Sequence, residues 1–284
     1  MPTEYVPAGS GLVSVSTAVP VPLPIVWRAM TRPERVRQWF GDLDQPMAPG
    51  AAVRIDFGDG DFFDAHVDEL RAEEAVRFRW RFLGVGQEAE VRWELGRGGA
   101  GTAVTVTDSC PGRPPSELAQ LDAGWRDFLG RLGRYLATGE SARYAWRAVI
   151  DGGTSLPAGP WRPLSDSTVT DWLPVALEGA EPRWFFIVDD NGPRRFAIRQ
   201  WDLVAGQSLR FAVVIPEAGS THCDVRAEPA GGGTWLTVRH DGWRQLALSD
   251  MRARGLRHRF AAAWTAALKI AADYAGRAAP RSAQ

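Results

Sequence analysis

Few side chains in this sequence have the type and spacing for covalent chemistry, and the main pair is Cys223 with His240. Both fall on strand-like runs with the same predicted inward parity, and a neighbouring imidazole can generate a reactive thiolate. The sequence favours a simpler interpretation, a cysteine packed as a small apolar residue beside a hydrogen-bonded wall histidine, because no orienting acid or oxyanion hole is identifiable. A zinc site that adds His222 is disfavoured, since adjacent strand residues point to opposite faces.

Other residues could orient a ligand inside an apolar cup. Asp108 continues the face of Val104, which predicts an inward carboxylate near a cavity mouth or, alternatively, a cap for the next turn. Gln200 shares the face of Phe196, and tryptophans on inward faces could either stack on a planar ligand or fill the core. No catalytic residue, metal or cofactor is predicted. The predicted ligand-binding residues are Phe63, Phe78, Trp80, Trp93, Asp108, Gln200, Cys223, Trp235 and His240.

Composition limits the classes of partner. The chain has 284 residues with 33 basic and 34 acidic side chains. This balance lacks the excess of basic side chains that is typical of proteins that bind nucleic acid or an anionic membrane. Its 13 Trp residues are the outlier and indicate large cores, aromatic-lined cavities, or both. Cys110 and Cys223 belong to no metal-spaced cluster, and no signal-like or membrane-spanning run is found. We therefore expect a cytoplasmic protein without a disulfide framework.

Hydrophobic periodicity predicts the elements that position these residues. In the first half, two short helices at about 24–30 and 31–41 follow the first strand, and GDGD at 58–61 predicts a tight hairpin. From Ser116 the apolar spacing changes to three and four, which predicts a long amphipathic helix ending at Gly139. Alternation predicts strands at 12–19, 52–57, 62–70, 75–82, 88–95 and 102–108.

The second half repeats this order. VWRAMTRPERVRQWF at 26–40 returns as PWRPLSDSTVTDWL at 160–173, GTAVTVTD at 101–108 returns as GTWLTVRHD at 233–241, and the helix pattern from Trp125 returns from Trp264. These anchors predict a duplication with domains at 1–139 and 142–276 and a tail at 277–284. Asn191-Gly192 predicts a hairpin. The second set of strands is expected at 143–150, 184–188, 195–204, 208–215, 221–227 and 234–240, and the last helix at about 248–274.

The first copy carries a family resemblance. Its pattern VW-x-AMT-x-P-x-x-V-x-x-WFG at 26–41, with Gly124-Trp125 and the leucine-rich helix, resembles the Bet v 1-like or START-like (SRPBCC) superfamily, nearest to the Hsp90-ATPase-activator-homologue branch. The second copy resembles it more faintly. The resemblance implies an α+β protein of two tandem helix-grip domains. Each would be a curved antiparallel sheet wrapped around a long C-terminal helix, with two short helices and a cavity for a hydrophobic ligand.

The resemblance also suggests functions. The superfamily includes polyketide cyclases, lipid and hormone carriers, and self-resistance proteins of enediyne producers. We therefore expect the protein to bind a hydrophobic small molecule of polyketide or enediyne type and either shape or sequester it, with turnover left open. One alternative is a co-chaperone-like module that binds a partner ATPase through its surface. Another is that the second domain has lost its cavity and only supports the first.

Overall fold

The computed structural model describes residues 11–99, 101–178, 181–189 and 192–278. It divides into two compact units, which we call the first and second unit. The first comprises Met1–Gly58 and Phe62–Ala145, and the second comprises Asp59–Asp61 and Trp146–Gln284. The turn Asp59–Asp61, which the sequence assigns to a hairpin of the first domain, thus belongs to the second unit. None of the helices in the described ranges is long and apolar enough to cross a membrane.

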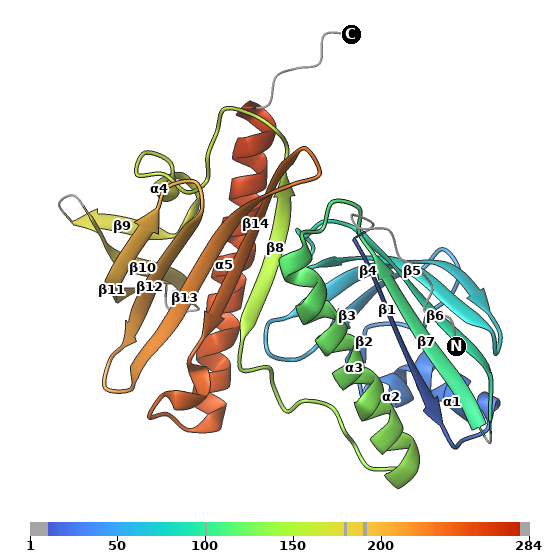
Figure 1. The fold of residues 1–284 in the computed structure, drawn as a ribbon. Helices are drawn as coiled ribbons and strands as arrows, with labels where there is room; N and C mark the ends of the chain where they lie inside the picture. The colour runs from blue at the N-terminus through green and yellow to red at the C-terminus, as the bar shows by residue number, and fades with distance from the viewer. Residues whose placement is uncertain (1–10, 100, 179–180, 190–191, 279–284) are drawn as a thin grey trace. The chain divides into compact units, whose positions relative to one another are not determined.

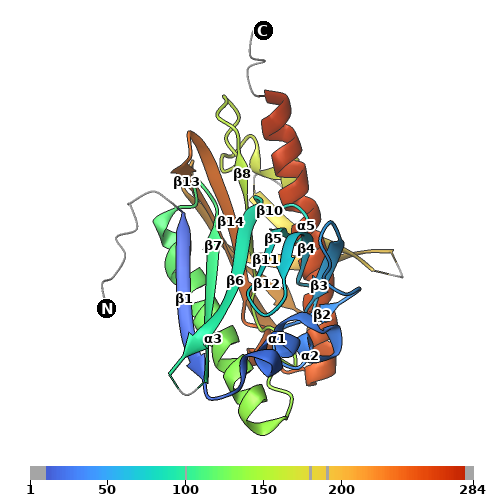
Figure 2. The same ribbon diagram turned by 90° about the vertical axis from the view of Figure 1, so that its right-hand side faces the viewer.

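The first unit is a seven-stranded antiparallel sheet with a long helix packed against it. Strand order is β1-β7-β6-β5-β4-β3-β2, and Figure 2 shows β1, β7 and β6 side by side. Its elements are β1 (Leu12–Val19), α1 (Leu23–Thr31), α2 (Pro33–Val36), β2 (Asp42–Leu43), β3 (Ala52–Asp56), β4 (Phe62–Arg71), β5 (Ala75–Phe82), β6 (Ala89–Gly98), β7 (Gly101–Ser109) and α3 (Pro115–Thr138).

Local sequence explains these elements. Proline stands in the first turn of α1, α2 and α3, where its missing N–H is not needed. Gly139 ends α3 with a left-handed φ of 73°, and its N–H donates to the carbonyl of Tyr135. Trp125, Leu129 and Leu132 form the buried stripe that α3 turns toward the core. Alternation on β5 and β6 buries Val76, Phe78, Trp80, Val91 and Trp93.

The second unit repeats this plan. Its seven strands run in the order β8-β14-β13-β12-β11-β10-β9, and α5 packs against β8 and β10 (Figure 1). Its elements are β8 (Ile150–Leu156), α4 (Val169–Trp172), β9 (Val175–Glu178), β10 (Glu181–Asp189), β11 (Gly192–Val204), β12 (Ser208–Ile215), β13 (Gly219–Ala230), β14 (Gly233–Asp241), the 3-10 turn η1 (Trp243–Gln245) and α5 (Asp250–Ala278).

The tandem helix-grip architecture predicted from the sequence is confirmed, with local corrections in the second unit. The strand expected at 143–150 is wrong, because β8 begins at Ile150. The second copy of the opening motif forms one short helix, α4, where two were predicted, since 160–165, which contains Pro160 and Pro163, is irregular. Asn191 of the predicted hairpin lies outside the described residues.

One packing detail of the opening motif is the same in both units. Trp39 donates its indole N–H to the carbonyl of Ala29 at 2.9 Å, and Trp172 donates to the carbonyl of Pro163 at 2.8 Å. Both tryptophans are fully buried. The repeated tryptophan therefore closes the same loop in each unit, even though the helix that precedes it in the first unit is missing from the second.

Candidate functional site

Aromatic rings of the first unit form a continuous stack. Phe63 on β4 lies nearly parallel to Trp80 on β5, with ring centroids 3.8 Å apart and an interplanar angle of 15°. Trp80 stacks on Trp125 of α3 at 5.5 Å and 18°. Trp125 stacks on Phe40 at 5.9 Å and 16°. Phe63 is half-buried and the other three rings are buried, so the stack runs from a partly accessible ring into the core.

Phe78 and Trp93 extend this stack through edge-on contacts. The Phe78 ring meets Trp80 at 5.5 Å and 74°, and Trp93 at 5.2 Å and 86°. Among the described residues, the buried indole N–H of Trp93 has no hydrogen-bond acceptor, which costs about 1–3 kcal/mol for such a donor. The structure thus brings Phe63, Phe78, Trp80 and Trp93 into one cluster. Their contact with a ligand stays a prediction.

Asp108 on β7 fixes the position of Trp125. The carboxylate is fully buried, its Oδ2 accepts from Trp125 Nε1 at 3.1 Å, and its Oδ1 accepts from Arg113 Nη1 and Nη2 at 3.0 Å each. Burial raises the pKa of Asp108, while Arg113 and the Trp125 N–H act in the opposite direction. Asp108 points inward as its strand parity predicts, and it does not cap α3, which has no side-chain cap.

His240 on β14 holds a tryptophan in the second unit in a similar way. Its Nδ1 accepts from Trp264 Nε1 at 3.0 Å, so Nδ1 carries no proton. Its Nε2 therefore donates to Thr221 Oγ1 at 2.7 Å. Burial lowers the pKa of His240 well below its ordinary value, with a further contribution from the Arg257 charge. The imidazole is thus neutral in a network that uses both ring nitrogens.

Asp108 and His240 occupy equivalent positions. Asp108 lies opposite Val13 of β1 and Val91 of β6. His240 lies opposite Ile150 of β8 and Cys223 of β13. Each stands on the strand that precedes the long helix, and each accepts the indole N–H of a helix tryptophan. The duplicated fold has therefore kept this hydrogen bond while exchanging an acid for an imidazole.

The structure gives no support to a reactive Cys223–His240 pair. The two residues are direct cross-strand neighbours and both are buried. However, both nitrogens of His240 are engaged by Thr221 and Trp264. Burial also raises the pKa of the Cys223 thiol well above its ordinary value, which disfavours a thiolate. Cys223 and His240 are wall residues in this arrangement.

Two predicted residues of the second unit lie apart from this cluster. Gln200 is exposed, so its predicted inward orientation is wrong. The register of β11 shifts between Arg199 and Asp202, and Gln200 adopts a left-handed φ of 57°, because a β-bulge at this point breaks the alternation. Trp235 is buried but has the strand parity opposite to His240, and its indole nitrogen lies beside Gly153.

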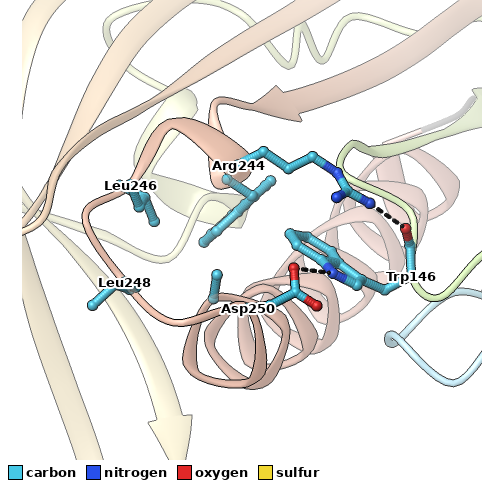
Figure 3. A pocket seen from close by; sticks show the side chains of 7 residues that line it. Trp146, Arg244, Leu246, Leu248 and Asp250 are labelled. Carbon is cyan, nitrogen blue, oxygen red and sulfur yellow. Dashed lines mark hydrogen bonds between the residues drawn. The ribbon is translucent and has the colours of Figure 1, made fainter.

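The second unit also contains a cavity of about 210 Å³ that includes none of the predicted site residues. Trp146 donates its indole N–H to Asp250 Oδ1 at 2.8 Å, and the Arg244 guanidinium lies 4.6 Å from the centroid of its ring. Figure 3 shows Arg244 and Asp250 on two sides of the Trp146 ring. The lining residues are Trp146, Trp243, Arg244, Leu246, Leu248, Asp250 and Ala253.

Sequence reasoning missed several residues that build these sites. Arg113 follows a proline-rich turn and has no periodic signal that would pair it with Asp108. Trp125 falls on the apolar spacing that predicts the helix from Ser116, and its repeat at Trp264 is the one signal that could have indicated a shared role. The η1 segment and the segment around Trp146 lie between regular elements, where periodicity carries no information. The cavity of the second unit was therefore outside the reach of pattern analysis.

A curved antiparallel sheet that grips one long helix, present twice in tandem, defines a protein of the helix-grip class. Residues 20–137 match the family described as "Activator of Hsp90 ATPase homolog 1-like protein". The crystal structure of DynU16, a protein in the dynemicin biosynthetic locus, is 56% identical, covers 93% of this chain and 99% of that chain, and superposes with a TM-score of 0.91. The chain belongs to the family of DynU16, and its residues 20–137 match the Hsp90-ATPase-activator-homologue family.

Other solved structures match less of the chain. The crystal structure of CalU16 from Micromonospora echinospora is 20% identical, covers 45% of this chain and 77% of that chain, and has a TM-score of 0.40. The solution structure of the Aha1 dimer from Colwellia psychrerythraea is 20% identical, covers 45% of this chain and 97% of that chain, and has a TM-score of 0.40. Among curated proteins, none matches the chain.

Proposed function

We propose that the protein binds a hydrophobic, largely planar molecule of the polyketide or enediyne type in the aromatic interior of the first unit. The observation that carries this proposal is the ring stack from Phe63 to Phe40, whose central Trp125 is held by the buried Asp108. Its place in secondary metabolism is supported by the 56% identity to DynU16, a protein in the dynemicin biosynthetic locus. The protein would shape a reactive intermediate for cyclisation or sequester a toxic product.

The geometry suits this role because it offers parallel ring faces in an apolar environment. A planar ligand that enters beside the half-buried Phe63 would replace ring–ring contacts by ligand–ring contacts, each contributing about 0.5–1.5 kcal/mol beyond area burial. Trp125 cannot turn freely, since its N–H is held by Asp108. The unpartnered N–H of Trp93 could donate to a carbonyl oxygen of the ligand. Holding a flexible polyketone in one conformer requires orientation more than catalytic groups.

Ligand titration with a matched pair of phenylalanine variants tests the proposal. Anthraquinones, other aromatic polyketides and enediynes should change tryptophan fluorescence and raise the Tm of the wild type. We expect Phe63→Ala to weaken binding by up to about tenfold, since it removes one aromatic contact. Phe62→Ala is the control, because Phe62 has the opposite strand parity and its ring lies under the Arg54 guanidinium at 4.3 Å. Absence of any fluorescence or thermal response across the panel would contradict the proposal.

A second candidate function is supported by the family match of residues 20–137. In this alternative the protein binds a partner ATPase of the Hsp90 type through its surface and changes its rate. The experiment is a pull-down with Hsp90 and a measurement of its ATPase rate with and without the protein. A stimulated rate that Phe63→Ala leaves unchanged would favour this function over ligand binding.

A further inference from the structure

We propose that the cavity of the second unit is a separate binding site for a zwitterionic α-amino acid with an apolar side chain. The cavity is formed by η1, the segment that follows it, the first turn of α5 and Trp146 (Figure 3). Its volume of about 210 Å³ is smaller than the roughly 300–1,000 Å³ of pockets that enclose drug-sized ligands. The ligand is therefore a small metabolite. The site is distinct from the ring stack of the first unit.

Trp146 forms the fixed centre of this site. Its side chain is 1% exposed, and its indole N–H is satisfied by Asp250 Oδ1 at 2.8 Å. Arg244 Nη2 donates to the carbonyl of Trp146 at 3.3 Å, and the guanidinium lies over the ring at 4.6 Å. Both charged groups are thus tied to one tryptophan and are held in place before any ligand arrives. Such pre-organisation lowers the entropy cost of binding.

Arg244 and Asp250 carry opposite charges that do not neutralise each other. Within the described residues neither forms a salt bridge, and Asp250 Oδ2 accepts no hydrogen bond. Arg244 uses one donor on the Trp146 carbonyl and keeps further N–H groups for a ligand. The first turn of α5 is already capped, because Ser249 Oγ accepts from the N–H of Arg252 at 3.4 Å. The charges available to a ligand in this cavity are therefore those of the Arg244 and Asp250 side chains, and not the partial charge of the helix N-terminus.

A zwitterion with an apolar group matches this arrangement. A guanidinium binds a carboxylate through paired N–H groups, and a carboxylate accepts from an ammonium. The other lining residues are the apolar Trp243, Leu246, Leu248 and Ala253. Figure 3 places Leu246 and Leu248 across from the Trp146 ring. An α-amino acid such as leucine or phenylalanine would place its charged end between Arg244 and Asp250 and its side chain against Leu246 and Leu248.

The test uses the full-length protein with L-phenylalanine, L-leucine and two truncated ligands. Binding is followed by calorimetry and by the indole N–H signal of Trp146, which Trp146→Phe identifies. N-acetyl-L-phenylalanine lacks the ammonium and L-phenylalanine amide lacks the carboxylate. We expect saturable one-to-one binding of the intact amino acids and at least about tenfold weaker binding of each truncated ligand, the scale of one charge-assisted contact.

Variants assign each charge to its partner. Arg244→Gln should weaken the binding of L-phenylalanine at least about tenfold. This variant should bind L-phenylalanine amide as tightly as L-phenylalanine, because the carboxylate has lost its partner. Asp250→Asn can still accept the indole N–H of Trp146. This variant should also bind L-phenylalanine at least about tenfold more weakly, and it should bind N-acetyl-L-phenylalanine as tightly as L-phenylalanine. Arg252→Gln changes an exposed arginine outside the cavity and is the matched control. Phe63→Ala should leave amino-acid binding unchanged, which separates this site from the proposed function.

Two outcomes would overturn the proposal. One is the absence of saturable binding by either amino acid up to its solubility limit. The other is binding that Arg244→Gln and Asp250→Asn leave as tight as in the wild type. Both variants change exposed side chains. A loss of amino-acid binding with an unchanged Tm is therefore caused by the loss of a ligand contact and not by misfolding.

Discussion

At the scale of single residues, Asp108 and His240 differ in the charge of the group that holds the helix tryptophan of each unit. Asp108 carries its charge into the core and is compensated there by Arg113, whose side chain is 9% exposed. His240 keeps the same acceptor function without charge, because its protonation would place a hydrogen on the nitrogen that faces Trp264. The helix tryptophan is therefore held by a carboxylate paired with Arg113 in the first unit and by a neutral imidazole in the second.

The depressed pKa of His240 predicts an acid-labile second unit. Below the ordinary histidine pKa of 6.5 the unfolded chain binds a proton that the folded chain does not, so stability is complete above this pH and is lost as the pH falls. We expect the wild type to lose about 1.4 kcal/mol of unfolding free energy per pH unit below 6.5, relative to His240→Asn. The Asn side chain keeps an acceptor for Trp264 without titrating.

Urea denaturation of both proteins at pH 7.5 and 5.5 measures this difference. The free energies should diverge at the lower pH, with the wild type falling further. Parallel losses in wild type and His240→Asn would show that other groups cause the acid sensitivity.

Strand parity explains which of these residues the sequence could predict. Asp108, Cys223 and His240 lie on regular strands, and their inward positions follow from alternation. Gln200 has the same kind of pattern, but the bulge inserts a residue into β11 and reverses its side. A bulge leaves no mark in the polarity of the side chains. Alternation in the sequence therefore predicts which strand positions face the core of each unit, but it cannot predict where a β-bulge reverses that alternation.

At the scale of elements, the turn Asp59–Asp61 and helix α5 form a buried charge network. Arg257 is 0% exposed and donates to the Asp59 carbonyl and to Asp61 Oδ2 at 2.7 Å each. Arg147 Nη1 also donates to Asp61 at 3.0 Å. Burial raises the pKa of Asp61 to about 6, against the attraction of Arg147 and Arg257. Gly60 permits this approach, because a Cβ there would meet the Ala261 Cβ at 2.9 Å.

Removing one member of this network should be costly. Arg257→Met leaves Asp59 and Asp61 buried without their main counter-charge, and we expect a loss of about 3–5 kcal/mol in unfolding free energy. The double variant Arg257→Met with Asp61→Asn should recover part of this loss, because it also removes a buried negative charge. Denaturant unfolding of the two variants and the wild type checks both. A single variant as stable as the wild type would show that the ion pairs contribute little.

This network was not predictable from the pattern of the turn. GDGD has the composition of an exposed hairpin turn, and a hairpin does connect β3 to β4. The burial of Asp59 and Asp61 depends on Arg257, which is distant in sequence and lies on a helix rich in other arginines. By contrast, the two long helices and most strands were predictable, because each has its own periodicity and end signals.

At the scale of the whole molecule, the second unit is not continuous in sequence. It includes Asp59–Asp61 in addition to Trp146–Gln284. A fragment cut at the domain boundary suggested by the internal repeat, near 142, would therefore lack Asp59 and Asp61, the acidic partners of Arg257, and keep the carbonyl of Val149. We expect fragment 142–284 to unfold at a lower Tm than the same unit in the full chain.

The Arg257→Met variant makes this expectation specific. In the full chain it removes a charge that is paired with Asp59 and Asp61 and should destabilise, whereas in fragment 142–284 it removes a charge that has no acidic partner there and should be neutral or stabilising. Thermal unfolding of the four proteins measures the change of sign. The same destabilisation in fragment and full chain would show that the turn contributes nothing to the second unit.

The pairing of Asp108 with Trp125 and of His240 with Trp264 also bears on how the two halves diverged after duplication. Codons for aspartate and histidine differ by a single base, so one nucleotide change converts one state into the other. At no step is the indole N–H left without an acceptor. Replacement by an aliphatic residue would strand that donor at a cost of about 1–3 kcal/mol. Natural variants at either position should therefore be confined to residues that accept a hydrogen bond, which sequencing of related genes can show.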